Sequence, residues 1–221
     1  MRAKKSLGQH FLKSEKALTQ IVGAGDIGID DVVLEIGPGT GVLTSKLLSS
    51  AGRVIAIEKD RELIPVLEEK FSKEIASGKL EIIEADVLKF DITNYLLLST
   101  TYKLIANIPY YITGAIIEKF LSAENQPKRV VLLIQKEVAE RIVAKPHSMR
   151  QDLATGDGPR GKESVLSIAV KVYGTPRIVA KVPAGAFVPA PKVDSAIILI
   201  ENISQDFFKD VDEKSFFRLL K

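Results

Sequence analysis

The chain has 221 residues, of which 46% are apolar and 27% charged, and this suffices for one complete α/β domain with a sizeable core. It contains no cysteine, so disulfides, zinc ribbons and mechanisms with a thiolate nucleophile are excluded. Two histidines, His10 and His147, are too few for most histidine-based metal centres, and we expect no bound metal. No apolar run reaches membrane-spanning length and the start lacks the apolar stretch of a signal peptide, so we expect a cytoplasmic protein without membrane contact.

The net charge of +3 is unevenly distributed. Residues 1–16 carry five basic groups and one acid, and residues 126–192 carry twelve basic groups and five acids, which leaves the remainder at −8. Two basic regions on an otherwise acidic body favour a polyanionic partner on one face. Charge alone leaves open the alternative that these side chains are merely solvated surface.

Apolar, β-branched runs alternate with helical patterns through the first two-thirds of the chain. The runs predict strands at Val32–Ile36, Arg53–Ile57, Leu80–Glu84, Leu104–Asn107 and Val130–Ile134. Helical patterns lie at Thr40–Ser50, Arg61–Ile75, Thr113–Ser122 and Lys136–Val143. Continuous apolar strands separated by helices predict an α/β fold, a doubly wound, Rossmann-like parallel sheet covered on both faces.

The character of the sequence changes after Lys145. Residues Pro146–Lys162 are rich in Gly, Pro, Asp and Arg and predict an exposed loop. Val165–Tyr173 and Val193–Ile200 are interpreted as two more strands, an antiparallel hairpin at the sheet edge, which brings the mostly parallel sheet to seven strands. The connection between them contains Pro176, Pro183, Pro189 and Pro191, so we expect it to be irregular but stiff.

A glycine-rich turn follows the first predicted core strand, in the segment from Val33 to Gly41. Gly37, Gly39 and Gly41 let the backbone turn tightly and approach a ligand without a Cβ in the way. The spacing is G-x-G-x-G, not the G-x-G-x-x-G of dinucleotide enzymes. Such a turn is weak evidence alone, because many α/β proteins need one merely to enter a helix.

Two acids follow the next strands in the order that a nucleoside site requires. Glu58 ends the second strand, 21 residues after Gly37, about where a carboxylate meets ribose hydroxyls. Asp86 follows the third strand and is placed to accept a hydrogen bond from an adenine amine. Either acid alone is more often a surface carboxylate, but together with the glycine turn they favour the binding of an adenosine.

The fourth strand ends in Asn107-Ile108-Pro109-Tyr110, which resembles the Asn-Pro-Pro-Tyr motif of amino-group methyltransferases. An adenine amine is a poor nucleophile because its lone pair is delocalised into the ring. The Asn107 side-chain carbonyl and the Ile108 backbone carbonyl can grip its two hydrogens, and Pro109 fixes the backbone that holds them. Tyr110 offers a ring for stacking on the base. The alternative, a Pro-containing turn with a buried tyrosine, is less favoured after Gly37, Glu58 and Asp86.

A base inside a structured RNA must be unstacked before it enters such a pocket, and aromatic rings then compensate for the lost stacking. Phe187, in Phe187-Val188-Pro189-Ala190-Pro191, is our candidate for the second ring beside the base, since its proline-rich surroundings would hold it in place. A phenylalanine before prolines is, by itself, more often a packing residue.

Together these segments resemble the ribosomal RNA adenine dimethyltransferases of the KsgA type, class I S-adenosylmethionine-dependent methyltransferases. The matching segments are Lys5–Leu12, Glu35–Gly41, Asn107–Thr113 and Phe187–Ser195, in the family's order along nearly the whole chain. The resemblance implies dimethylation of two adjacent adenines near the 3′ end of small-subunit (16S) ribosomal RNA, with the pre-30S particle as partner. It also implies cofactor contacts from His10, Leu12, Gly37, Gly39, Glu58, Asp86 and Asn107, and a target base flanked by Tyr110 and Phe187.

The resemblance further implies that residues 1–203 form the catalytic domain with a basic N-terminal segment, and that residues 204–221 begin a small helical C-terminal domain. Members often have Asn where this chain has His10, and the loop at 146–163 is longer than in most of them. We expect a monomer. Two alternatives stay open: an Erm-like enzyme that methylates an adenine of 23S ribosomal RNA, and a non-catalytic RNA-binding assembly factor.

Overall fold

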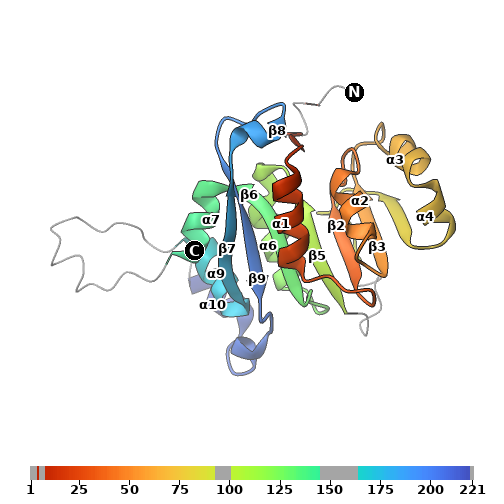
Figure 1. Ribbon diagram of the computed structural model, residues 1–221. Helices are drawn as coiled ribbons and strands as arrows, with labels where there is room; N and C mark the ends of the chain where they lie inside the picture. Colours follow the sequence, from red (N-terminus) through yellow and green to blue (C-terminus); the bar gives the residue numbers. More distant parts are fainter. Residues whose placement is uncertain (1–3, 5–7, 93–100, 145–163, 220–221) are drawn as a thin grey trace.

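Seven strands form one sheet in the computed structural model, which describes residues 4, 8–92, 101–144 and 164–219 (Figure 1). The strand order is β4-β3-β2-β5-β6-β9-β7, in which the first five are parallel and β9 runs antiparallel to both of its neighbours. The bounds are β2 Val32–Ile36, β3 Arg53–Glu58, β4 Leu80–Glu84, β5 Tyr102–Asn107, β6 Arg129–Gln135, β7 Thr175–Val182 and β9 Ser195–Glu201. The predicted seven-stranded, mostly parallel sheet is confirmed.

Helices cover both faces of this sheet, because successive residues of each strand point to opposite sides. In β2, Val33 belongs to one hydrophobic cluster and Leu34 to the other. Helices α1, α2 and α3 pack on the Val33 side, and α6, α7 and α9 pack on the Leu34 side. Their bounds are α1 Glu15–Gly25, α2 Val42–Leu48, α3 Ile64–Lys70, α4 Ser72–Ala76, α6 Thr113–Leu121, α7 Lys136–Val143 and α9 Val165–Tyr173. Among the described helices, none has both the length and the apolar character needed to cross a membrane.

The helix expected over Arg61–Ile75 is interrupted at Phe71, which separates α3 from α4. The Phe71 backbone is non-helical, with φ −114° and ψ 27°, and its side chain is buried. A Cβ on Gly41 would lie only 2.5 Å from the Phe71 ring. The interruption therefore seats this ring directly against the glycine-rich turn.

The strand expected at Val165–Tyr173 is wrong, because this segment is helix α9. The Ser164 hydroxyl accepts a hydrogen bond from the Ser167 backbone N–H at 3.1 Å and so caps the helix start. Ser167, Val170 and Tyr173 are buried at a spacing of three, which is a helical period. A short apolar run cannot be assigned to strand or helix from hydrophobicity alone, and here the cap and the period decide.

The antiparallel hairpin at the sheet edge does exist, but its first strand is β7, within the connection that we expected to be irregular. Pro176 is tolerated there because β7 is the edge strand, where one missing N–H costs no ladder hydrogen bond on the open side. The second strand, β9, confirms the strand expected at Val193–Ile200 with a shift of two residues at its start. The loop predicted at Pro146–Lys162 lies outside the described residues.

The N-terminal segment, residues 8–13, lies beside the carboxyl edge of the sheet, which sequence patterns did not predict. Its strand β1, Phe11–Leu12, pairs antiparallel with β8, Phe187–Val188, so that Leu12 lies opposite Phe187. The Lys13 backbone N–H donates to the Ala186 carbonyl at 2.8 Å. Ser14 then caps α1. Two parts of the chain that are about 175 residues apart in sequence thereby meet.

The described C-terminal residues pack onto α9 through aromatic rings. A 3-10 turn at Asp206–Phe208 and helix α10, Glu213–Leu219, place Phe208 and Phe217 with ring centroids 5.2 and 6.2 Å from that of Tyr173. Both phenylalanines pack against the Leu34-side cluster. The helical character expected after Ser204 is confirmed, and the division into two domains at residue 203 stays a prediction.

Candidate active site

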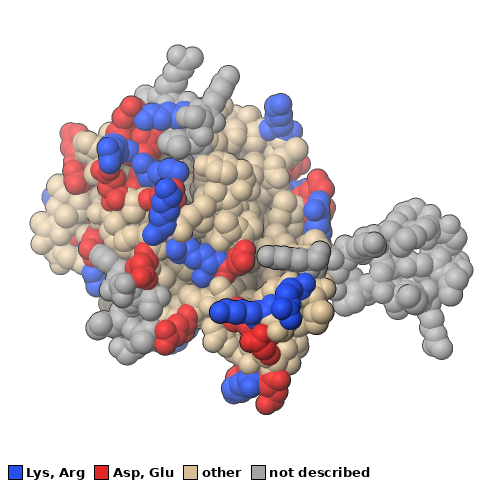
Figure 2. All heavy atoms as spheres, turned by 180° about the vertical axis from the view of Figure 1, so that it is seen from behind, with Lys and Arg blue, Asp and Glu red and all other residues tan. Residues whose placement is uncertain are grey.

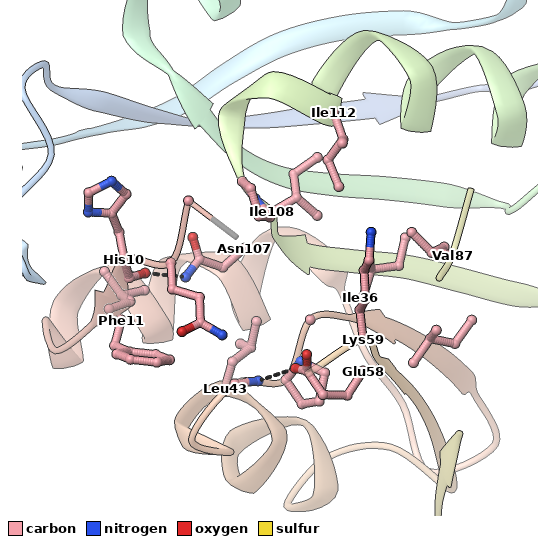
Figure 3. Close-up of a pocket in the computed structure, with 18 of the residues that line it drawn as sticks. His10, Phe11, Ile36, Leu43, Glu58, Lys59, Val87, Asn107, Ile108 and Ile112 are labelled. Atoms are coloured by element: carbon pink, nitrogen blue, oxygen red, sulfur yellow. Dashed lines mark hydrogen bonds between the residues drawn. The ribbon is translucent and has the colours of Figure 1, made fainter. Parts of the chain in front are cut away.

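A cavity opens at the carboxyl ends of β2, β3 and β5, where the strand order reverses between β2 and β5. Ligands of open α/β sheets bind at such switch points. Figure 3 shows Glu58 and Leu43 on one side of this cavity and Asn107 and His10 on the other. The sequence-predicted residues His10, Leu12, Gly37, Gly39, Glu58, Asp86, Asn107, Pro109 and Tyr110 all line it.

The glycine-rich turn has the conformation that its composition predicts. Gly37, Gly39 and Gly41 have φ of +68°, +61° and +73°, values that only glycine adopts readily. A Cβ on Gly39 would approach the Phe11 ring to 3.3 Å. On the far side, the Lys70 ammonium donates to the Thr40 and Gly41 carbonyls at 3.0 and 3.1 Å. The turn is thus fixed from both sides.

Glu58 is a buried carboxylate held by backbone groups. Its Oε2 accepts from the Gly39 N–H at 3.1 Å and its Oε1 from the Asp60 N–H at 2.7 Å. Burial raises the pKa of this carboxyl, and the two backbone hydrogen bonds oppose that rise. With the side chain anchored to the glycine turn, its remaining lone pairs are available to a hydroxyl pair in the cavity.

Asp86 lies further along the same cavity and is more exposed. Its Oδ2 pairs with the Lys59 ammonium at 3.0 Å, and its Oδ1 accepts from the Leu88 N–H at 3.1 Å. The hydrogen bond from Lys59 is the main reason that the pKa of Asp86 is lowered. Asp86 is therefore an ionised hydrogen-bond acceptor, as an adenine amine requires.

Asn107 ends β5 with its side chain fixed by the N-terminal segment. Its Nδ2 donates to the His10 backbone carbonyl at 3.4 Å, a contact drawn in Figure 3. With the NH₂ group so engaged, the Oδ1 carbonyl oxygen is the end of the amide left for a ligand. Pro109, at φ −57° and ψ 134°, then leads into a 3-10 turn at Tyr110–Ile112. Ile108 lines the cavity between them.

Tyr110 is held at its hydroxyl and faces the His10 ring. The hydroxyl lies 2.6 Å from the Ser195 Oγ, at the start of β9. Burial raises the pKa of Tyr110, so its phenol stays neutral near neutral pH. The His10 and Tyr110 rings are nearly parallel, at an interplanar angle of 19° and a centroid distance of 6.1 Å.

Phe187 is the one predicted site residue that the structure does not bring into the cavity. It is only 3% exposed and packs in the Val33-side cluster with Leu12, its partner across the β1–β8 pair. It is not among the residues that line the cavity. In this arrangement Phe187 is a packing residue, and its stacking on a base stays a prediction.

Several residues that shape the site were not found by sequence reasoning. Asp60 accepts from the Lys4 ammonium at 2.7 Å and from the Gln9 amide at 2.8 Å, and so ties the N-terminal segment to the loop after β3. Phe11 covers Gly39, and Ser195 holds Tyr110. The segment Lys5–Leu12 stood out through its resemblance to a family, but hydrophobic periodicity carries no signal for a segment whose partners are distant in sequence.

Glu35 lies behind the glycine turn, fully buried beneath α2. Among the described residues, neither of its oxygens makes a well-aligned hydrogen bond, and the same holds for the Thr44 hydroxyl, which lies close to the carboxyl group. Burial raises the pKa of Glu35 to about 8 and nearby Glu58 adds to the rise, whereas Thr44 and Lys70 oppose it. Glu35 is therefore largely a neutral carboxylic acid at pH 7.

The sheet is doubly wound with an antiparallel strand beside β6, and a glycine turn is followed by two acids at successive strand ends. This combination is that of a class I S-adenosylmethionine-dependent methyltransferase. The profile of the family described as ribosomal RNA adenine dimethylase matches residues 1–221. The chain therefore belongs to the ribosomal RNA adenine dimethylase family.

Similar proteins agree with this assignment. The chain is 42% identical over 221 residues to the ribosomal RNA small subunit methyltransferase A of Dehalococcoides mccartyi. The matched region covers all of this chain and 70% of that protein. It is 40% identical over 220 residues to the protein of the same name from Clostridium perfringens, over 100% of this chain and 72% of the relative.

Two solved structures are similar along most of the chain. A dimethyladenosine transferase from Plasmodium falciparum superposes with a TM-score of 0.75 at 33% identity, over 96% of this chain and 69% of the other. The 23S rRNA methyltransferase ErmE superposes with a TM-score of 0.72 at 28% identity, over 95% and 75%. The fold is thus shared with both types of enzyme, whereas the curated relatives at 36–42% identity carry the small-subunit name.

Proposed function

We propose that the chain transfers methyl groups from S-adenosylmethionine to the exocyclic amines of two adjacent adenines near the 3′ end of small-subunit ribosomal RNA, which gives dimethyladenosines. The observation that carries the proposal is the placement of Asn107: its amide is oriented by the His10 carbonyl, at the end of β5, in the cavity that Gly37 and Glu58 line. A purely structural turn does not need an oriented side-chain amide on the wall of a cavity that a glycine-rich turn and a buried carboxylate also line.

The residues around the cavity fit the proposed cofactor. Glu58 would bind both ribose hydroxyls, Asp86 would accept from the adenine amine, and the turn with Gly37 and Gly39 would lie against the remainder without a Cβ in the way. The residues 8–13 would close over it, with His10 and Leu12 on the cavity wall. When bound, S-adenosylmethionine supplies an electrophilic methyl group on its sulfonium.

The reaction needs a freed lone pair more than it needs a base. The Asn107 Oδ1 and the Ile108 carbonyl would each accept one hydrogen of the target amine, which favours a pyramidal nitrogen whose lone pair points at the methyl group. Held by these two carbonyls, the target nitrogen would be placed to accept the methyl group that the bound cofactor supplies, and the proton left on the methylated nitrogen would pass to water. Positioning two reactants in line supplies most of the acceleration in such a transfer.

The face opposite to that of Figure 1 carries mixed charge. Figure 2 shows the face opposite to Figure 1, where lysine and arginine side chains alternate with acids. Within the basic region at 126–192, the side chains of Arg129, Arg141, Arg177 and Lys181 are in ion pairs. We propose that residues 1–203 form the catalytic domain, that residues 204–221 begin a helical domain that helps to dock RNA, and that the chain acts as a monomer.

The test is methyl transfer to purified ribosomal particles, followed by mass spectrometry of the RNA. Small-subunit particles that lack the modification should gain two dimethyladenosines, and large-subunit particles should gain none. Methylation of 23S RNA alone would favour the Erm-like alternative instead. Binding to small-subunit particles without any methyl transfer would favour a non-catalytic assembly factor.

A further inference from the structure

The N-terminal segment, residues 8–13, is attached to the body of the protein on both sides of His10. After His10, strand β1 pairs with β8. Before it, the attachment is the side chain of Asp60, in the loop that follows β3. We infer that Asp60 is a positioning residue: by holding this end of the segment, it keeps the His10 carbonyl where that carbonyl orients Asn107. Asp60 itself does not line the cavity, and its role, which rests on the proposed function, is exerted through the segment.

The carboxylate of Asp60 is buried and surrounded by hydrogen-bond donors. Its side chain is only 5% exposed. Its Oδ1 accepts from the Lys4 ammonium at 2.7 Å and from the Glu62 backbone N–H at 3.1 Å. Its Oδ2 accepts from the Gln9 Nε2 at 2.8 Å. Burial alone would raise the pKa of Asp60, but the hydrogen bonds from Lys4 and Gln9 lower it below its ordinary value. Asp60 is therefore an ionised carboxylate, and hydrogen bonds to such a group are among the stronger ones in proteins.

Gln9 connects this carboxylate to the segment with both ends of its side-chain amide. The Nε2 donates to Asp60, and the Oε1 accepts from the Lys4 backbone N–H at 2.8 Å. Because each end of the amide has its own partner, the side chain cannot rotate without losing one of them. The next residue is His10, whose backbone carbonyl accepts from the Asn107 Nδ2 at 3.4 Å. Two consecutive residues of the segment therefore link Asp60 to the Asn107 amide.

The backbone of Asp60 makes a different contact from its side chain. Its N–H donates to the Glu58 Oε1 at 2.7 Å, and a side-chain substitution at residue 60 leaves this N–H in place. The backbone thus serves the cofactor half of the site, whereas the side chain holds the segment that orients Asn107. Substitutions at Glu58 and Asp60 should therefore have different kinetic effects although the two residues are neighbours: the first should weaken cofactor binding, and the second should lower turnover. A residue that only stabilised the fold would not separate the two quantities.

The experiment exchanges the donor and the acceptor of the contact between Asp60 and Gln9. Asp60→Asn sets an amide NH₂ group against the Gln9 NH₂ group, and Gln9→Glu sets two carboxylates against each other. Each single variant should lower kcat on small-subunit particles by about 10- to 100-fold, the effect of losing one hydrogen bond to a charged group. The double variant restores the bond in the reverse direction and should regain most of the lost kcat. The cofactor dissociation constant, measured by calorimetry, should stay within a few-fold in all three variants, because the contact to Glu58 is made by the backbone.

Hydrogen–deuterium exchange of the protein alone supplies a second readout, which needs neither RNA nor cofactor. Exchange reports local opening, so the amides of residues 8–13 should exchange clearly faster in Asp60→Asn and in Gln9→Glu than in the unaltered protein. The amides of β2 and β3 should keep their slow exchange. The double variant should return the segment to slow exchange. Because the double variant carries both substitutions, a loss that it reverses cannot come from misfolding.

Glu62→Gln is the matched control, because it removes the other ion pair of Lys4, at 3.0 Å and on an exposed side chain, and leaves the Asp60 carboxylate intact. It should change neither kcat nor the exchange of residues 8–13.

Three results would each overturn the role of Asp60: full kcat in Asp60→Asn, equal losses of kcat and cofactor affinity, or a double variant as impaired as the single ones. If the unaltered protein transfers no methyl group to small-subunit particles, the proposed function fails instead. The exchange of residues 8–13 would still show whether Asp60 holds the segment, so the two failures are distinguishable.

Discussion

The two halves of the cavity are built in different ways. The cofactor half comprises the Gly37–Gly41 turn, Glu58 and Asp86, which follow three strands that pair directly in parallel register. The target half comprises His10, the motif Asn107–Tyr110 and Ser195. Its parts come from the N-terminal segment, from β5 and from the start of β9, and lie up to 185 residues apart in the sequence.

The difference in construction indicates where each half is rigid. In the cofactor half each acid is held by backbone N–H groups one to two residues away or across a single strand pair, as Glu58 is by Asp60 and Gly39. In the target half Asn107 depends on the His10 carbonyl and Tyr110 on Ser195. Changes in the first half should therefore alter cofactor affinity, and changes in the second should alter turnover on RNA.

The largest effect is expected at Asn107. Asn107→Ala removes the acceptor for the target amine, and loss of one such transition-state hydrogen bond costs about 100- to 1,000-fold in kcat. The cofactor dissociation constant should stay within a few-fold, because Asn107 lies on the opposite side of the cavity from Glu58 (Figure 3). Single-turnover methylation of small-subunit particles and calorimetry with the cofactor measure the two quantities. Equal losses in both would erase the distinction between the halves.

This difference in construction also explains why the sequence predicted the contacts of the cofactor half better than those of the target half. Glu58 and Asp86 could be placed because the carboxyl ends of parallel strands share one edge, so a residue's position after its strand already gives its location. Asn107 and Tyr110 were found through their motif. The contacts of His10 with Asn107, Tyr110 and Pro189 could not be predicted. His10 directly precedes the two-residue strand Phe11–Leu12, and a strand this short has no hydrophobic period from which its pairing partner could be inferred. The buried state of Phe187 was missed because burial depends on that same pairing.

Glu58 should show the opposite pattern to Asn107. Glu58→Gln leaves a neutral amide where a carboxylate accepts from the ribose hydroxyls, and a hydrogen bond to a charged group contributes about 1.5–3 kcal/mol, or roughly 10- to 100-fold in affinity. Saturating cofactor should restore most of the turnover. Glu84→Gln is the matched control, because Glu84 lies opposite Glu58 in the β3–β4 register yet points to an exposed ion pair with Arg61. A weakened affinity in both variants would exclude a specific role for Glu58.

The buried carboxyl of Glu35, which lies behind the glycine turn of the cofactor half, should make the free energy of unfolding depend on pH. The pKa of Glu35 is about 8 in the folded protein, whereas the ordinary value is 4.5. At a pH between these two values, the unfolded chain has released a proton that the folded chain still holds. The free energy of unfolding should therefore fall as pH rises through this window, by roughly 1 kcal/mol per pH unit. Glu35→Gln should lack this decline. Urea unfolding at pH 5.5, 6.5 and 7.5 measures the difference, and parallel pH profiles for the two proteins would contradict a protonated Glu35.

Lys70 should give the smallest effect and test whether the glycine turn is stabilised from behind. Its ammonium holds the Thr40 and Gly41 carbonyls and lies 5.0 Å from the centre of the Phe71 ring. Lys70→Met keeps the apolar stem but loses the donors, and with about 1 kcal/mol per net hydrogen bond the cofactor KM should rise about fivefold at nearly constant kcat. Lys73→Met, on the exposed surface of the adjacent α4, should leave KM unchanged. Lys70 lies behind the turn and does not line the cavity. A fall in kcat at saturating cofactor would therefore mean that the turn also positions the residues of the target half. In that case the two halves would be coupled rather than separate.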